Sequence, residues 1–308
     1  QIFYQYFPSL LDINSVHFEV GVTPKVRTTE TADAFIRSLV ELQLKSNAGN
    51  ASHQKQQQQF SQEQLSAGVE GIPYASPPVG RLRFMPPVTP PTWTTTRSAT
   101  TFGPVCPQRL ADISNETEAL GRMTRGRLKL LRRLYPLLAN QSEDCLYLNI
   151  YTVASATREL ARLPVLMFIH GESYEWNAGS TVDGSVLASA SGLVVVTINY
   201  RLGILGFFPS PGGSARGNFG LMDQVAALHW IQENIREFGG DERNVTVMGH
   251  GTGAACVNFL MLSPMARGLF HRAIMASGSA LSPWAIASDA VLHGQTVARA
   301  VGCQSSAQ

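Results

Sequence analysis

The five residues at 249–253, Gly-His-Gly-Thr-Gly, constrain the fold of this chain more than any other feature. Their outer glycines match the frame G-x-S-x-G, a sharp turn from a strand to a helix that exposes a nucleophilic serine. Residues 244–248 predict the strand and residues 252–262 predict the helix. The middle position is Gly251, which has no side chain and cannot attack a carbonyl carbon. The frame of a catalytic turn is therefore present without its nucleophile. This degenerate elbow comprises Gly249, His250, Gly251, Thr252 and Gly253.

Alternating strands and helices are expected around this turn. Continuous apolar runs at 165–169 and 192–198 predict strands that are buried on both faces. Shorter buried strands are expected at 245–248 and 273–276, and apolar residues recur at helical spacing over 222–238. This order predicts an α/β fold with a parallel sheet and right-handed crossovers.

Further sequence blocks lie on both sides of the elbow. In their order and spacing they resemble the type-B carboxylesterase and cholinesterase family of α/β-hydrolases, over roughly residues 67–308. The resemblance implies an α/β-hydrolase fold that is truncated after the elbow region. The blocks are GIPYASPPVG at 71–80, EDCLYLNI at 143–150, NYRLG at 199–203, the stretch 217–240, and GLFHRAIMASG at 268–278.

Three blocks narrow the resemblance to one branch of the family. Residues 251–260, 279–286 and 106–145, with glycine at the nucleophile position, resemble the neuroligins, most closely the insect type. That branch is non-catalytic, and the resemblance implies an adhesion ectodomain at the postsynaptic plasma membrane. It also implies a neurexin-type partner with calcium only at the partner interface, no other cofactor, no metal of its own, and a homodimer. Those surfaces lie mostly in the second half of the family domain.

Two other functions stay open at this point. One is an active type-B carboxylesterase with an unusual nucleophile, and the other is a different non-catalytic junction protein of cholinesterase type. The net charge of +2 gives no indication of nucleic-acid binding. Between Cys106 and Cys145 there is no tryptophan of the kind that cholinesterases offer to a choline head group. Acetylcholine is therefore not an expected ligand.

Domain organisation is predicted in two parts. Residues 1–66 are expected to be a divergent, poorly ordered segment, with a helical pattern at 34–45 and a glutamine-rich tract at 54–64. Residues 67–308 are expected to be a partial carboxylesterase-like domain. The sequence shows neither a secretory signal nor a run of 18 apolar residues, so we expect the amino-terminal part of a longer surface protein. An exposed sheet edge at 273–276 predicts that residues 67–308 aggregate when expressed alone.

A second degenerate region is expected after the strand at 165–169. Active relatives have a run of glycines there, whose N–H groups stabilise the oxyanion of the transition state. Here the loop contains Gly171, Glu172 and Ser173. Glu172 either places a carboxylate where negative charge would develop or points to solvent. The family's remaining triad residues would lie past Gln308, so no complete triad is expected.

Cysteines and sequons indicate an oxidising compartment. The resemblance pairs Cys106 with Cys145, which bracket a long surface loop, and leaves Cys303 without its partner. Cys256 is expected to be free and buried in the helix after the elbow, as a small apolar residue. Asn115 and Asn140 flank the same loop and are the expected glycosylation sites.

The same loop carries cations with no acidic residue among them. Leu128, Leu131 and Tyr135 predict the buried stripe of an amphipathic helix. The exposed face is either an ordinary solvated surface or a site for an acidic glycan or an acidic protein. The cations are Arg122, Arg125, Arg127, Lys129, Arg132 and Arg133.

The resemblance also implies two structural ion pairs. Arg83 is expected to pair with Glu143, and Arg201 with Asp223. Both are expected to be buried, and breaking such a pair from one side costs about 3–5 kcal/mol.

Overall fold

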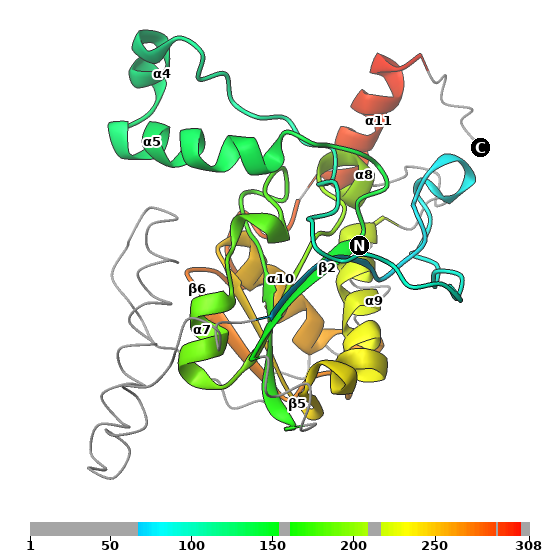
Figure 1. The fold of residues 1–308 in the computed structure, drawn as a ribbon. Coiled ribbons are helices and arrows are strands. Elements are labelled where there is room, and N and C mark those ends of the chain that lie inside the picture. The colour runs from blue at the N-terminus through cyan, green and yellow to red at the C-terminus, as the bar shows by residue number, and fades with distance from the viewer. Residues whose placement is uncertain (1–66, 154–160, 209–216, 288, 303–308) are drawn as a thin grey trace, which may run out of the picture.

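The described residues build one six-stranded sheet with helices around it (Figure 1). A computed structural model describes residues 67–153, 161–208, 217–287 and 289–302. The strands lie in the order β1-β2-β4-β3-β5-β6. Their bounds are β1 Ala67–Pro73, β2 Tyr147–Thr152, β3 Leu163–Ile169, β4 Val194–Ile198, β5 Gly240–His250 and β6 Arg272–Ala276.

The helices connect these strands and cover the sheet. In Figure 1, α7 and α9 lie on opposite sides of the sheet. The α-helices are α4 Glu116–Arg122, α5 Arg125–Leu134, α7 Ser185–Ser191, α8 Gly203–Phe207, α9 Phe219–Asn234, α10 Thr252–Leu262 and α11 Ala290–Ala300. The 3-10 helices are η4 Gly80–Leu82, η5 Tyr135–Leu138, η6 Gly179–Thr181, η7 Ile235–Phe238 and η8 Pro264–Ala266.

The sheet is parallel where the sequence predicts a strand-helix alternation. β3 pairs in parallel with β4 and β5, and β5 with β6, so that Met167 lies opposite both Val196 and Val247. The other two strands lie outside that alternation, and both pair antiparallel: β2 with β4, and β1 with β2. The long segment between β1 and β2 contains α4 and α5, and its Thr100 forms an isolated bridge with Glu70 of β1. The described strands form a mixed sheet of the α/β-hydrolase type.

Alternate residues of β3 belong to two different apolar cores. Val165, Met167 and Ile169 pack in the large core that contains side chains of α9 and α10. Leu166 and Phe168 pack in a second core with residues of α7. Because successive side chains of a strand point to opposite faces, this pattern requires helices on both sides of the sheet. β3 is thus a central strand, and its carboxyl end leads directly into the candidate site.

A separate lobe lies beyond the end of the sheet, at the top of Figure 1. We define the α4–α5 lobe as residues 106–145. Its helix α5 buries Leu128, Leu130, Leu131 and Leu134, more than the predicted stripe, while Tyr135 is only partly buried. Leu130 and Leu134 pack with Val105 and Ala178, so the lobe shares a small apolar core with the chain after β3.

β6 is the last strand of the described sheet. Residues 273–276 are half-buried there, whereas all of β4 is buried. The following segment exposes Leu281 (86%) and Trp284 (49%), an unusual amount of apolar surface. The predicted helix at 34–45, the glutamine-rich tract and Cys303 lie outside the described residues.

Candidate functional site

The elbow has the backbone of a nucleophile turn. β5 ends at His250, α10 begins at Thr252, and Gly251 between them has φ 59° and ψ −119°. The Gly251 N–H donates to the carbonyl oxygen of Ala276 at 2.9 Å. A Cβ atom built on Gly251 would meet no other atom within 4 Å. The position that a nucleophile would occupy is therefore open, and its backbone conformation would strain a residue with a side chain but not the glycine that is present.

The surrounding glycines are fixed by backbone contacts. A Cβ on Gly253 would overlap the carbonyl oxygen of Ile169, and a Cβ on Gly249 would overlap the backbone of Gly253. A Cβ on Gly171 would overlap the carbonyl oxygen of His250. The close approach of β3, β5 and α10 thus requires glycine at these three positions, independently of any chemistry.

The oxyanion loop has a backbone conformation that favours glycine, although its residues carry side chains. Glu172, Ser173 and Tyr174 follow one another with φ of 78°, 61° and 59°, all in the left-handed region. For residues with a Cβ this conformation costs roughly 1–2 kcal/mol each. Side chains now stand on the loop that would have to present bare N–H groups to an oxyanion.

Glu172 does not point freely to solvent. Its side chain is 17% exposed, and its Oε2 accepts a hydrogen bond from Nη2 of Arg127 at 2.9 Å. The guanidinium carbon of Arg127 lies 5.1 Å from the ring centroid of Trp176. Sequence analysis identified Glu172 and Arg127 separately but gave no sign that they meet, because 45 positions separate them.

Two histidines end the strands on either side of this site. His170, which follows β3, is buried and stacks on Tyr200 with a centroid separation of 4.4 Å. Burial lowers the pKa of His170 to about 4. His250 is partly buried; burial lowers its pKa, and the Glu172 carboxylate opposes that shift. Both rings are therefore favoured in the neutral form.

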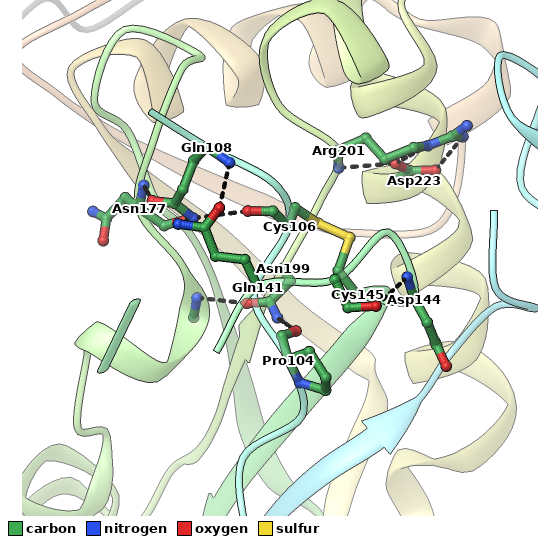
Figure 2. Close-up of a disulfide and its surroundings, with 12 residues drawn as sticks. Pro104, Cys106, Gln108, Gln141, Asp144, Cys145, Asn177, Asn199, Arg201 and Asp223 are labelled. Carbon is green, nitrogen blue, oxygen red and sulfur yellow. Dashed lines mark hydrogen bonds and ion pairs between the residues drawn. A yellow bond between two sulfur atoms is a disulfide. The ribbon is translucent and has the colours of Figure 1, made fainter. Parts of the chain in front are cut away.

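Cysteine chemistry at the site is structural. Cys256 is a free, fully buried thiol in α10, and burial raises its pKa to about 12. A thiol of that pKa stays protonated and is a poor nucleophile. Cys106 and Cys145 form a disulfide with Cα atoms 4.9 Å apart, the pairing that the resemblance implies (Figure 2).

The disulfide is surrounded by hydrogen bonds that tie the lobe to the loop after β3 (Figure 2). Oε1 of Gln108 accepts from the N–H of Asn177 at 2.8 Å, and Nε2 of Gln108 donates to the carbonyl oxygen of Asn177 at 3.2 Å. Oε1 of Gln141 in turn accepts from the N–H of Gln108 at 2.9 Å. These residues were not identified from the sequence, because polar side chains that bond to a distant backbone have no local pattern.

The two expected ion pairs form, but only one is buried. Arg201 donates from Nη2 to Asp223 at 2.7 Å, with side chains 3% and 0% exposed. Burial raises the pKa of Asp223, and the hydrogen bonds from Arg201 oppose that shift. Arg83 makes a two-pronged contact with Glu143 at 2.6 and 2.7 Å, but these side chains are 45% and 29% exposed. The expectation that both pairs are buried is therefore wrong for Arg83, and solvent screens the attraction between its guanidinium and Glu143.

The lobe's cations are partly neutralised by acids from outside α5. Arg122 pairs with Glu118 and Arg132 with Glu116, both acids of α4. Arg127 is turned to Glu172, as described above. Arg125, Lys129 and Arg133 are exposed on α5. The structure thus reduces the excess of positive charge that the sequence indicates, and the acidic-glycan site stays a prediction.

The two expected glycosylation sites are accessible. Asn115 is exposed at the start of α4, and its side-chain oxygen accepts from the N–H groups of Thr117 and Glu118. Asn140 is also exposed, in the turn before the second cysteine of the disulfide. In both cases the side chain lies on the surface of the α4–α5 lobe.

Comparison with known proteins identifies the family. The model of the Carboxylesterase family matches residues 50–308, so the chain belongs to that family. Mouse (Mus musculus) neuroligin-3 is 42% identical over 254 residues, which is 76% of this chain and 30% of that protein. Mouse neuroligin-2 is 42% identical over 251 residues, with the same two shares. The chain is a neuroligin-like member with a cholinesterase-type fold.

Hydrolases are equally similar in sequence. Mouse acylcarnitine hydrolase is 46% identical over 241 residues, or 77% of this chain and 41% of that protein. The chain thus spans less than half the length of each of these relatives. Overall identity does not separate the adhesion branch from the enzymes. Among the helices that the structure describes, none is both long and apolar enough for a membrane span.

Proposed function

We propose that this chain is the cholinesterase-like part of a neuroligin-type adhesion protein and does not hydrolyse esters. The observation that carries the proposal is Gly251, at the apex of an otherwise intact elbow. The left-handed, side-chain-bearing oxyanion loop with Glu172 supports it independently. Because both the nucleophile and the oxyanion donors are altered, acyl transfer by the family mechanism has neither of its two requirements.

The adhesion role follows from the likeness to neuroligins. In the full-length protein we propose a neurexin-type partner, calcium only at that interface, a homodimer, and a place on the postsynaptic cell surface. The disulfide and the two exposed sequons of the α4–α5 lobe fit passage through the secretory pathway. Cys256 offers no alternative nucleophile, since its thiol is enclosed and protonated.

Ester turnover and covalent labelling test the loss of hydrolysis. The chain should give no release of p-nitrophenol above background and no label from an organophosphate probe, and Gly251→Ser should behave in the same way. A carboxylesterase with an intact G-x-S-x-G serves as the positive control. Labelling of any residue between Gly249 and Gly253 in the unaltered chain would show that hydrolysis persists.

Binding tests the adhesion role separately. Full-length protein on one set of cells should bind a soluble neurexin ectodomain in calcium, and the binding should disappear with a chelator. Absence of binding together with absence of turnover would favour the alternative of another non-catalytic junction protein. Turnover without binding would favour the carboxylesterase.

A further inference from the structure

The carboxylate of Glu172 lies between the degenerate site and the α4–α5 lobe. It comes from the loop after β3, and its partner Arg127 comes from the first turn of α5. We propose that Glu172 is a docking residue that fixes the orientation of the α4–α5 lobe on the α/β core. The side chain that occupies the oxyanion loop would then supply a charged contact between the two parts.

Three kinds of contact meet at this junction. Arg127 is bonded to Glu172 at 2.9 Å while its guanidinium lies over the ring of Trp176. With side chains 29% and 17% exposed, the pair is less screened than a surface pair and is held in one geometry by the aromatic ring. The paired hydrogen bonds of Gln108 and Asn177 join the same two segments.

Two ion pairs between residues of α4 and α5 do not have this property. Arg122–Glu118 lies within α4, and Arg132–Glu116 joins α5 to α4. The four side chains are between 49% and 63% exposed. They stabilise the lobe internally but do not attach it to the core. Arg127 is distinguished from them both by its burial and by a partner on the sheet side of the junction.

The backbone of the loop indicates that the contact has a role. Glu172 is held at φ 78°, where glycine would have no strain. A glycine there would relieve the backbone strain but would also remove the carboxylate. The side chain of Glu172 thus destabilises the loop through its backbone and stabilises it through the contact with Arg127. Ser173 beside it has the same strain at φ 61° and is exposed, with no contact to the lobe among those described. Ser173→Gly is therefore a matched control for Glu172→Gly.

The orientation of the lobe decides where its surface features lie. Asn115, Asn140 and the exposed cations Arg125 and Lys129 all belong to it. Their position relative to the core, and so to any partner that contacts both, depends on how the lobe is attached. The inference does not depend on the adhesion role, since a docked lobe would orient these groups for any partner.

Hydrogen exchange of the full chain, secreted with an added leader peptide, tests the proposal. Glu172→Gly, Glu172→Gln and Arg127→Ala should each speed amide exchange over residues 116–138 by about five- to tenfold, the change expected from losing a partly buried ion pair. The double variant Arg127→Ala with Glu172→Gly should exchange no faster than Arg127→Ala alone, because that single variant already removes the contact with Glu172. Exchange in β3 and β5 should be unchanged.

Two controls separate docking from general destabilisation. Ser173→Gly changes the same loop and should leave exchange of residues 116–138 unchanged. Arg132→Ala breaks an exposed pair inside the lobe and should have less than a twofold effect. If Glu172→Gly leaves exchange of the lobe unchanged, or if Ser173→Gly accelerates it equally, the carboxylate does not dock the lobe and the proposal is wrong.

Discussion

The elbow and the oxyanion loop lie at the same end of the sheet, yet they depart from a catalytic site in opposite ways. In the elbow a side chain is missing at Gly251, where the structure has room for one. In the oxyanion loop side chains are present at Glu172, Ser173 and Tyr174, where the backbone conformation favours glycine. The elbow therefore retains its backbone geometry without a nucleophilic side chain. The oxyanion loop instead carries side chains, and one of them, Glu172, contacts Arg127.

The glycines of the two regions are of two kinds: those that close packing requires, and the one at the position of the nucleophile. Gly249, Gly253 and Gly171 are enclosed by backbone atoms, so any larger residue must displace a strand or a helix. Gly251 faces open space, and only the left-handed backbone restricts it. The packing of an α/β-hydrolase elbow therefore does not depend on a side chain at position 251, because the enclosed glycines and not the apex support it.

The largest expected effect distinguishes these two kinds of glycine. Gly253→Ala should destabilise the chain by about 3 kcal/mol or more, because its Cβ would overlap the carbonyl of Ile169. Gly251→Ala should cost only about 1–2 kcal/mol, from backbone strain without overlap. Urea unfolding followed by tryptophan fluorescence measures both. Equal losses would show that the elbow is not held by the enclosed glycines.

An intermediate effect concerns the histidine before the oxyanion loop. His170 has a pKa lowered to about 4 in the folded chain, against 6.5 in its ordinary state. Between these values the unfolded chain binds a proton that the folded chain does not, so stability falls as pH falls. The loss from pH 7 to pH 5 should be about 2 kcal/mol. His170→Phe keeps a ring beside Tyr200 and should reduce this pH dependence.

His250 provides the comparison for that measurement. It is only partly buried and Glu172 opposes its shift, so His250→Phe should change the pH dependence less than His170→Phe. Unfolding curves of the three chains at pH 7 and pH 5 decide the order. A larger change for His250→Phe would mean that His250, and not the buried His170, controls the loss of stability in acid.

The smallest expected effect is a gain in stability. Ser173→Gly should stabilise the chain by about 0.5–1 kcal/mol, because it relieves a left-handed backbone and removes no contact of the lobe. Ser173→Ala keeps the Cβ and should give no gain. Melting temperatures of the two variants measure the difference. If glycine is no better than alanine, the loop is not strained at this position.

Much of the fold was predictable because its signals are local. The apolar runs at 165–169 and 192–198 predict β3 and β4, and the turn at 249–253 predicts the junction of β5 with α10. The buried thiol of Cys256 follows from its place in an apolar helix. The disulfide and the Arg201–Asp223 pair were inferred from the family resemblance and not from local pattern.

The burial of an ion pair was not predictable in the same way. Arg83–Glu143 and Arg201–Asp223 look alike in the sequence, but the first lies in solvent and the second in the core. Likewise, no local pattern shows that β1 and β2 join the sheet antiparallel to β4. Strand direction at that edge depends on the path of the connecting chain, which periodicity does not record.

The sequence by itself determined that the chain has an elbow without a nucleophile, because the absence of a side chain at Gly251 needs no coordinates. It also placed a carboxylate in the oxyanion loop at Glu172. Only the tertiary structure decided what that carboxylate contacts. Its partner Arg127 is 45 positions away in the chain and belongs to a lobe that is closed by a disulfide. Contacts of that kind depend on how separate elements pack, and packing is a property of the folded chain as a whole.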